Sequence, residues 1–177
     1  MDIYLVDGTY ELFRHFYALP SHVTARGEEV AATRGVLGSI AGILESGVTH
    51  IGVATDHVIE SFRNDIWPGY KTSEGVDPRL LAQFTLLEDA LQSMGVVVWP
   101  MVELEADDAL AAAAKCLGVF SKVGRVYICS PDKDLAQCVQ NSRIVQLVRR
   151  TRTVRDEAGV RDRFGVPPSS IPDYLAL

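Results

Sequence analysis

Short apolar runs alternate with helical patterns along this chain. Four of the runs have the length and the β-branching of buried strands, namely Ile3–Val6, Ile51–Ala54, Val96–Trp99 and Val126–Cys129. A fifth run, Ile144–Val148, predicts another strand nearer the C-terminus. Runs that are apolar throughout are typical of parallel sheets, in which both faces of a strand are covered.

Between these runs, apolar residues recur at helical spacing. Val36–Leu44 shows this spacing, and Gly47 follows as a stop. The clearest helix begins with Asp77 as N-cap and Pro78 as its first residue, and Gly95 ends it. Further helices are predicted over Leu104–Leu117, Val160–Phe164 and Asp173–Leu177. The alternation of strands and helices predicts an α/β fold with helices on both faces of a parallel sheet.

Each of the first four strand candidates is followed by carboxylates. Asp7 ends the first strand and Asp56 ends the second. The clusters after the third and fourth strands consist of Glu105, Asp107, Asp108, Asp132 and Asp134. In an open parallel sheet, ligands bind outside the carboxyl ends of the strands, so we expect all seven acids at one edge of the molecule.

These acids predict a site for a divalent cation. Clustered carboxylates with no compensating arginine nearby would repel one another, so a positive ion is expected among them. Oxygen ligands with few His or Cys residues nearby favour Mg²⁺ or Mn²⁺ over zinc. Capping of helix N-termini explains any one of these acids alone. The metal site is favoured because acids follow four strands.

The net charge of −6 argues against a nucleic-acid partner only at first sight. Seven of the 23 acidic residues belong to the clusters, which leaves 16 acidic against 17 basic residues. Two divalent ions would add four positive charges. The overall charge is therefore compatible with a nuclease whose carboxylates hold metal ions.

The remaining composition predicts one compact cytoplasmic domain without a membrane anchor. No apolar run approaches the roughly 20 residues needed to span a bilayer, and the N-terminus lacks the basic region of a signal peptide. The three cysteines, Cys116, Cys129 and Cys138, lie in apolar stretches and form no CxxC pair. We expect them to be reduced core residues.

Several motifs, taken in order, resemble one family of nucleases. The stretches that carry the resemblance are Leu5-Val6-Asp7-Gly8, Leu12 to Pro20, Ala25-Arg26-Gly27-Glu28, Asp56 with Ser61-Phe62-Arg63, Gly69-Tyr70-Lys71, Glu105-Ala106-Asp107-Asp108 and Ser130 to Leu135. Together they are similar to the bacterial 5′→3′ exonucleases and flap endonucleases, which include the 5′-nuclease domain of DNA polymerase I. Each motif alone is weak, whereas the ordered set is specific.

The resemblance implies a PIN-like, resolvase-like fold: three α/β/α layers around a mostly parallel central sheet. Residues 1–177 would form a single domain of this kind. It would be a monomer that hydrolyses phosphodiester bonds near the 5′ ends and flaps of DNA, using two Mg²⁺ ions, or Mn²⁺ in their place.

The resemblance also assigns roles to individual residues. Asp7, Asp56, Glu105 and Asp107 would hold the first metal; Asp107, Asp132 and Asp134 would hold the second, and Asp108 would lie in the outer shell. Arg63 and Lys71 would be catalytic and grip the scissile phosphate. Tyr70 could stack on a terminal base.

Simpler roles stay open for the basic and aromatic residues. Arg63 could be a surface ion-pair partner, Lys71 a solvated loop lysine and Tyr70 a packing residue. Arg14 would point either to phosphate or to a local carboxylate. The basic stretch Arg149–Arg155 could contact phosphates, but its alternation with Thr and Val favours an exposed edge strand kept soluble by charge.

The chain departs from the family in two places. After Tyr70-Lys71, where many members carry another arginine, this sequence has Thr72–Gly75 with Glu74 in it. In the family, a sequence like Pro172–Leu177 leads into a Gly-Asp-x-x-Asp motif and a helix–hairpin–helix. This sequence contains neither, so we expect a weakened second metal site and no duplex grip from that part.

Three other functions share features with this sequence. A haloacid dehalogenase-type phosphatase fails, because Leu5 stands where its nucleophilic aspartate would be. A PIN-type ribonuclease shares the acids at the strand ends and stays a rival. A non-catalytic or weakly active DNA-binding fragment is the third alternative.

Overall fold

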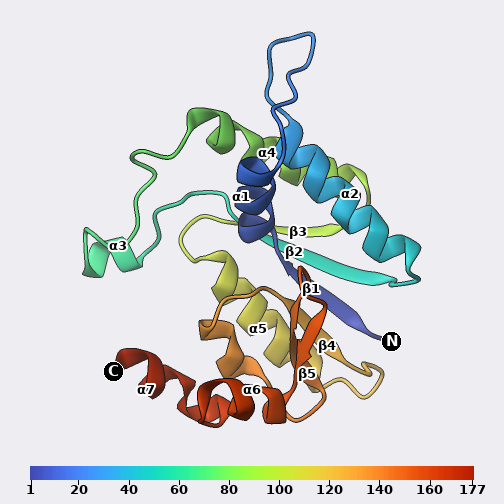
Figure 1. Cartoon of the computed structure of the whole chain (residues 1–177), viewed down its shortest axis with the longest axis vertical. Helices are drawn as coiled ribbons and strands as arrows, with labels where there is room; N and C mark the ends of the chain where they lie inside the picture. The colour runs from blue at the N-terminus through green and yellow to red at the C-terminus, as the bar shows by residue number, and fades with distance from the viewer. The chain divides into compact units, whose positions relative to one another are not determined.

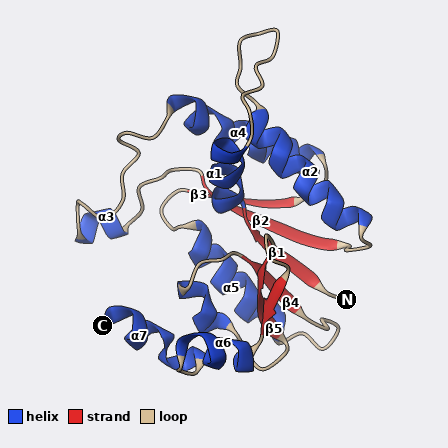
Figure 2. Cartoon of the chain, in the orientation of Figure 1, coloured by secondary structure: helices blue, strands red, loops and turns tan.

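The computed structural model describes all 177 residues and has a mixed α/β fold (Figures 1 and 2). The strands are β1 (Ile3–Asp7), β2 (His50–Asp56), β3 (Val97–Met101), β4 (Val126–Cys129), β5 (Ile144–Val148) and β6 (Thr153–Arg155). Their order in the sheet is β3-β2-β1-β4-β5-β6. The β1–β4, β2–β3 and β4–β5 pairs are parallel, and β6 runs antiparallel to β5.

Helices connect most of these strands. They are α1 (Gly8–Ala18), α2 (Ala31–Glu45), α3 (Arg63–Ile66), α4 (Pro78–Ser93), α5 (Ala106–Gly118), α6 (Glu157–Phe164) and α7 (Ile171–Ala176), with 3-10 helices η1 (Asp134–Cys138) and η2 (Pro168–Ser170). The chain divides into two compact units. The α1–α4 unit comprises Asp7–Gly47 and Gly52–Ala109; the β4–β6 unit comprises Met1–Val6, Val48–Ile51 and Leu110–Leu177.

In the α1–α4 unit, three helices pack against one another around a common core. Helices α1, α2 and α4 are in mutual contact. Their fully buried apolar side chains include Leu12, Val36, Ile40, Leu80, Leu87 and Leu91. Gln83 of α4 is also buried, and its side-chain oxygen accepts from the backbone N–H of Thr33 at 3.0 Å. This bond satisfies a polar group in the core and ties α4 to the first turn of α2.

In the β4–β6 unit, the three strands lie beside a small cluster of helices. The cluster has a core of Ala136, Val139, Val160 and Ile171, against which Phe164, Val166 and Leu175 pack. It joins η1, α6 and α7, which are remote in sequence. The segment after β4, which carries Asp132 and Asp134, is thereby anchored at its far end by Ala136.

Most of the elements predicted from the sequence are confirmed. All five predicted strands form, and Asp77 caps α4 by accepting the N–H of Arg79 at 2.8 Å. Gly47 and Gly95 have positive φ and end their helices, as expected. The helix predicted from Leu104 begins at Ala106, because Glu105 and Asp108 together form its cap.

Two other expectations have different outcomes. The edge strand predicted within the basic stretch is confirmed as β6, although it covers only Thr153–Arg155. The expectation that all three cysteines are core residues is wrong: Cys129 is buried and Cys138 is partly buried, but Cys116 is exposed. Cys116 lies on the face of α5 opposite Ala114 and Leu110, which are fully buried, and the alanine-rich sequence gives that helix little apolar contrast between its faces.

No helix has both the length and the continuous apolar surface that crossing a bilayer requires.

An arm of residues 19–30 connects α1 and α2 and projects from them (Figure 1). Its base is fastened by the carboxylate of Glu29. That group accepts the hydroxyl of Ser21 and the backbone N–H groups of His22 and Ala31, the latter two at 2.9 Å. These donors, the Ser21 hydroxyl first, lower the pKa of Glu29 to about 2.

Replacing Glu29 with glutamine should loosen the arm, because an amide cannot accept all three bonds. We expect trypsin to cleave after Arg26 severalfold faster at neutral pH. The matched control is Glu28→Gln, since the Glu28 side chain accepts only from Thr24, at 3.3 Å. In the wild type, the stabilisation of the arm by the Glu29 carboxylate is fully present above pH 4.5, the ordinary pKa of a glutamate. It is lost as the pH falls towards 2, the lowered pKa of Glu29. Equal cleavage of the two variants would contradict this role.

Candidate metal and phosphate site

Asp7 and Asp56 end neighbouring segments of the α1–α4 unit and are almost completely buried. Asp7 is the N-cap of α1 and accepts the N–H of Tyr10 at 2.8 Å. Asp56 ends β2, and its Oδ1 accepts the N–H of Ala106, the first residue of α5, at 2.7 Å. A buried carboxylate is held in place by such bonds, because its lone pairs need donors when water is excluded.

The two residues that flank Asp56 in the sequence both contact the carboxylate of Glu88. Thr55 donates its hydroxyl to Oε1 of Glu88 at 2.6 Å, and Nδ1 of His57 lies 2.7 Å from Oε2 of the same carboxylate. Glu88 projects from the buried face of α4. Glu88 was not among the residues predicted from the sequence, although a glutamate within an apolar helical stripe is a visible signal. The two neighbours of Asp56 are therefore fixed to one helix.

Two cations lie among the carboxylates of this unit. Nζ of Lys71 is 2.6 Å from Oδ2 of Asp56 and 3.4 Å from Oε2 of Glu105. Arg63 donates from Nη1 to Glu105 at 2.8 Å and binds Asp108 through both Nη1 and Nη2, at 2.9 and 2.8 Å. The expectation that no arginine compensates the cluster is therefore wrong. Residues 63 and 71 are remote in sequence from Glu105 and Asp108, but the chain folds back to bring them together.

The pKa values follow from these contacts. Burial opposes the ionisation of Glu105, but the Ser61 hydroxyl and the charges of Lys71 and Arg63 outweigh it and hold its pKa below the usual range. Hydrogen bonds from Arg63 lower the pKa of Asp108. Burial also disfavours the ammonium form of Lys71, yet its bond to Asp56 and the nearby negative charges raise its pKa. The side chains of Glu105, Asp108, Lys71 and Arg63 are therefore charged at neutral pH and stabilise one another.

The remaining residues of this unit have separate surroundings. Tyr70 is 48% exposed, and the guanidinium of Arg63 lies 4.7 Å from the ring centroid of Phe62 and 6.0 Å from that of Tyr70. Arg14 contacts Glu11 at 2.5 Å and Nε2 of His15 at 2.8 Å on its own helix, as expected for the local-carboxylate alternative. Asp107 lies in the first turn of α5 and is half-buried.

In the β4–β6 unit, Asp132 and Asp134 follow β4 and lie close together. The N–H of Asp134 donates to Oδ1 of Asp132 at 2.8 Å, and the N–H of Asp132 donates to the buried Ser130 hydroxyl at 3.2 Å. Burial raises the pKa of Asp134, and the negative charge of Asp132 raises it further. A nearby cation would relieve this repulsion.

The structure therefore brings Asp56, Glu105 and Asp108 together around two cations, and it places Asp132 beside Asp134. No group of three or more Asp, Glu, His or Cys side chains is arranged to hold a metal ion. In the α1–α4 unit, Lys71 lies between Asp56 and Glu105, and Arg63 lies between Glu105 and Asp108. The ligand assignments implied by the resemblance thus stay proposals.

Sequence comparisons give a consistent family. Residues 2–165 match the 5′-3′ exonuclease, N-terminal resolvase-like domain. The chain is 32% identical to a 5′-3′ exonuclease of Aquifex aeolicus, over 99% of this chain and 60% of that protein. It is 31% identical to DNA polymerase I of Pseudomonas aeruginosa, over 98% of this chain but 19% of the polymerase. The chain thus spans between about a fifth and three fifths of these relatives.

Solved structures share the fold. The 5′-exonuclease of phage T5, solved with bound divalent metal ions (zinc), matches with a TM-score of 0.69 and 17% identity, over 97% of this chain and 64% of that one. A T5 flap endonuclease in a complex with DNA and metal ions matches with a TM-score of 0.63 and 19% identity, over 97% and 64%. From the family match and the fold together, this chain belongs to the 5′-3′ exonuclease family, as its N-terminal resolvase-like domain.

Proposed function

We propose that the chain is a metal-dependent nuclease domain that hydrolyses DNA phosphodiester bonds near 5′ ends, as a 5′→3′ exonuclease and 5′-flap endonuclease with a two-metal mechanism. The observation that carries the proposal is the ammonium group of Lys71 between Asp56 and Glu105, at 2.6 and 3.4 Å. Two carboxylates from different segments converge on one positive charge there. Such convergence fits a site built to attract cations and phosphate rather than a structural ion pair on the surface.

The donor chemistry fits divalent ions. We assign the first ion to Asp7, Asp56, Glu105 and Asp107, and the second to Asp107, Asp132 and Asp134. All of these are hard oxygen donors, which suits Mg²⁺ as the working ion and Mn²⁺ as a substitute. Ions of this kind supply a water nucleophile of lowered pKa and stabilise negative charge on the leaving oxygen.

Arg63 and Lys71 have two sets of possible partners in this scheme. In the structure they neutralise Glu105, Asp108 and Asp56. Once the carboxylates have other positive partners, both cations can turn to the phosphate of the substrate. The guanidinium fork of Arg63 matches the geometry of two phosphate oxygens, whereas Lys71 acts as a point charge.

The aromatic rings around Arg63 favour a single strand as part of the substrate. Phe62 is 40% and Tyr70 48% exposed, and Trp67, between them in sequence, is 70% exposed. Exposed rings next to a phosphate-binding cation can stack on unpaired bases. Arg14 stays a secondary candidate for phosphate contact, because its guanidinium is already engaged with Glu11 and His15.

Cleavage of 5′-labelled oligonucleotides tests the proposal. We expect short 5′ products from single-stranded and 5′-flap DNA in Mg²⁺ or Mn²⁺, and none in EDTA. Preferential cleavage of a matched RNA strand would favour the PIN-type ribonuclease instead. An absence of cleavage, with DNA bound in EDTA, would favour the non-catalytic DNA-binding alternative.

A further inference from the structure

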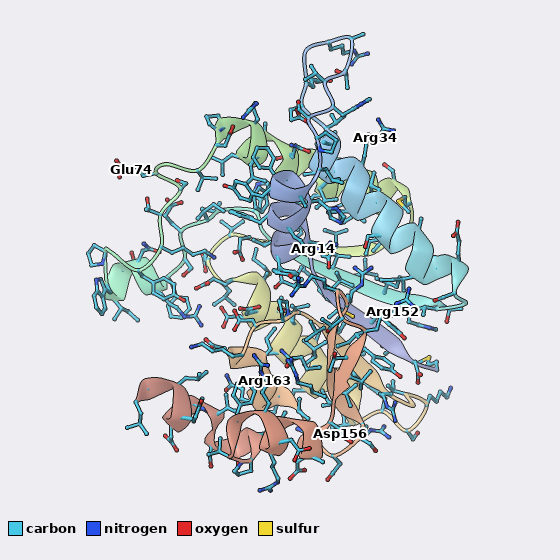
Figure 3. All side chains as sticks on the ribbon, viewed as in Figure 1. Arg14, Arg34, Glu74, Arg152, Asp156 and Arg163 are labelled. Carbon is cyan, nitrogen blue, oxygen red and sulfur yellow. The ribbon has the colours of Figure 1, made fainter.

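The β4–β6 unit carries a concentration of arginines that none of the roles above uses. Residues 149–163 contain six arginines and three carboxylates, within a chain whose net charge is −6. The arginines belong to the β5–β6 turn, to β6 and to α6. Figure 3 labels Arg152 on the turn and Arg163 on the helix. The excess of positive charge is therefore local and lies on adjoining elements.

Four of these arginines have no carboxylate partner. Arg150, Arg152 and Arg163 are exposed and Arg155 is partly buried, and none of them forms an ion pair. By contrast, Arg161 on the same helix pairs with Glu157 at 3.1 Å. Burial and the positive charge of Arg163 both lower the pKa of Arg155. Arg155 and Arg163 are thus close enough to repel each other, and an anion between them would remove that repulsion.

Several contacts hold these arginines in position. Nη1 of Arg155 donates to Oε1 of the fully buried Gln146 at 3.2 Å. The guanidinium of Arg163 lies 5.3 Å from the ring centroid of Phe164, which packs on the unit's core cluster. Arg152 has φ +55, in the left-handed region that non-glycine residues adopt at a cost of about 1 kcal/mol or more. The turn that presents Arg150 and Arg152 is therefore a defined structure.

Arg150 and Arg152 lie at the same edge of the sheet as Asp132. Strands β4 and β5 are parallel, so the turn after β5 and the segment after β4 leave the sheet at the same edge. Gln146 connects them directly: its Nε2 donates to the carbonyl oxygen of Asp132 at 2.6 Å, and its Oε1 accepts from Arg155. Positive charge is thus fixed next to a proposed ligand of the second metal ion.

We propose that Arg150, Arg152, Arg155 and Arg163 form a binding surface for the phosphate backbone of the DNA substrate. The inference rests on the proposed function, because it supposes that DNA passes the carboxylates at this edge. Backbone phosphates suit the surface better than bases do, because it is rich in guanidinium groups that carry no carboxylate partner and has one aromatic ring, Phe164, beside Arg163. The surface would position the strand without reading its sequence.

The test compares two double variants with the same loss of charge. Arg150→Gln with Arg152→Asn removes two cations of the surface, and asparagine tolerates the left-handed conformation at 152. The control is Lys115→Gln with Lys122→Gln in the same unit. Lys115 is exposed on α5, and Lys122 precedes β4, at the opposite edge of the sheet. Fluorescence anisotropy with labelled single-stranded and duplex DNA in EDTA measures binding without cleavage.

The arginine variant should bind DNA more weakly than the wild type, and the log–log slope of affinity against salt should fall by about 2. Its deficit should shrink by about tenfold between roughly 50 and 200 mM salt. The control should keep the wild-type slope, and the double variant Arg150→Lys with Arg152→Lys should keep most of the wild-type affinity. The strand type that shows the larger effect identifies the backbone that lies on the surface.

Equal slopes for the wild type and the arginine variant would overturn the inference, and increased aggregation of that variant would then assign the arginines to protection of the β6 edge. These outcomes are separable from failure of the proposed function. A chain that cleaves DNA but shows equal slopes loses only this surface. A chain that neither cleaves nor binds DNA loses both.

Discussion

An Asp56→Asn variant should keep its fold and lose about three orders of magnitude in the rate of divalent-ion-dependent DNA cleavage. Asparagine has nearly the shape of aspartate, and its Oδ1 can still accept the N–H of Ala106, which in the wild type lies at 2.7 Å. The amide that replaces Oδ2 carries no charge and cannot accept from Lys71. The variant therefore loses the negative charge that the proposed metal site and Lys71 share, with little change in packing.

The experiment pairs circular dichroism and thermal unfolding with single-turnover cleavage. Asp89→Asn is the matched control, because Asp89 is an exposed carboxylate on α4 of the same unit, outside the cluster. It should cleave at the wild-type rate. If Asp56→Asn cleaved within about threefold of the control, its carboxylate would have no part in catalysis, and the metal assignment would lose its central member.

A Lys71→Met variant should show opposite effects on metal binding and on catalysis. Methionine fills the space of the lysine stem but leaves Asp56 and Glu105 without the ammonium that both contact. Without divalent ions, the fold should lose roughly 1–3 kcal/mol of stability, at the lower end because the side chain of Lys71 is 31% exposed. Divalent ions should then bind more tightly than to the wild type, because no ammonium competes with them.

Cleavage by the same variant should be about 100-fold slower or more, because the phosphate loses a cation. Calorimetric titration with Mn²⁺ and thermal unfolding with and without Mg²⁺ measure the first effect, and single-turnover cleavage measures the second. A Lys71→Arg control should keep a metal affinity near that of the wild type. Weaker Mn²⁺ binding by Lys71→Met than by the wild type would show that Lys71 favours metal binding and does not compete with the ions.

The elements of the fold could be predicted from the sequence because their signals are local. A β-branched apolar run, or the cap Asp77 followed by Pro78, specifies its structure within a few residues. The same holds for Asp7 and Asp56, which the strand pattern placed at strand ends. What the sequence could not supply was the partner of each charge.

Arg63 and Lys71 illustrate this limit. Arg63 is 42 residues from Glu105 and 45 from Asp108 along the chain, and Lys71 is 15 residues from Asp56. No periodicity connects such positions. Repulsion among the carboxylates was therefore expected, whereas in the folded chain Arg63 and Lys71 neutralise them. Glu88 differs, because its position between Leu87 and Leu91 on the buried face of α4 was readable. A charged residue within an apolar stripe predicts a hydrogen-bonding partner from another element, here the buried Thr55 and its neighbour His57.

Gly8, the first residue of α1, shows that an absent atom can position a carboxylate. A Cβ added to Gly8 would lie 2.8 Å from the carbonyl oxygen of Ala54 and from side-chain atoms of Val53 and Thr55. The chain can turn from Asp7 directly into a helix beside β2 only because this volume is empty. The close approach of the Asp7 and Asp56 segments thus depends on the absence of a side chain at residue 8, and not only on the charges of the site. Even one methyl group at residue 8 would push the Asp7 and Asp56 segments apart. The carboxylates of the site would then be separated although none of them had been replaced.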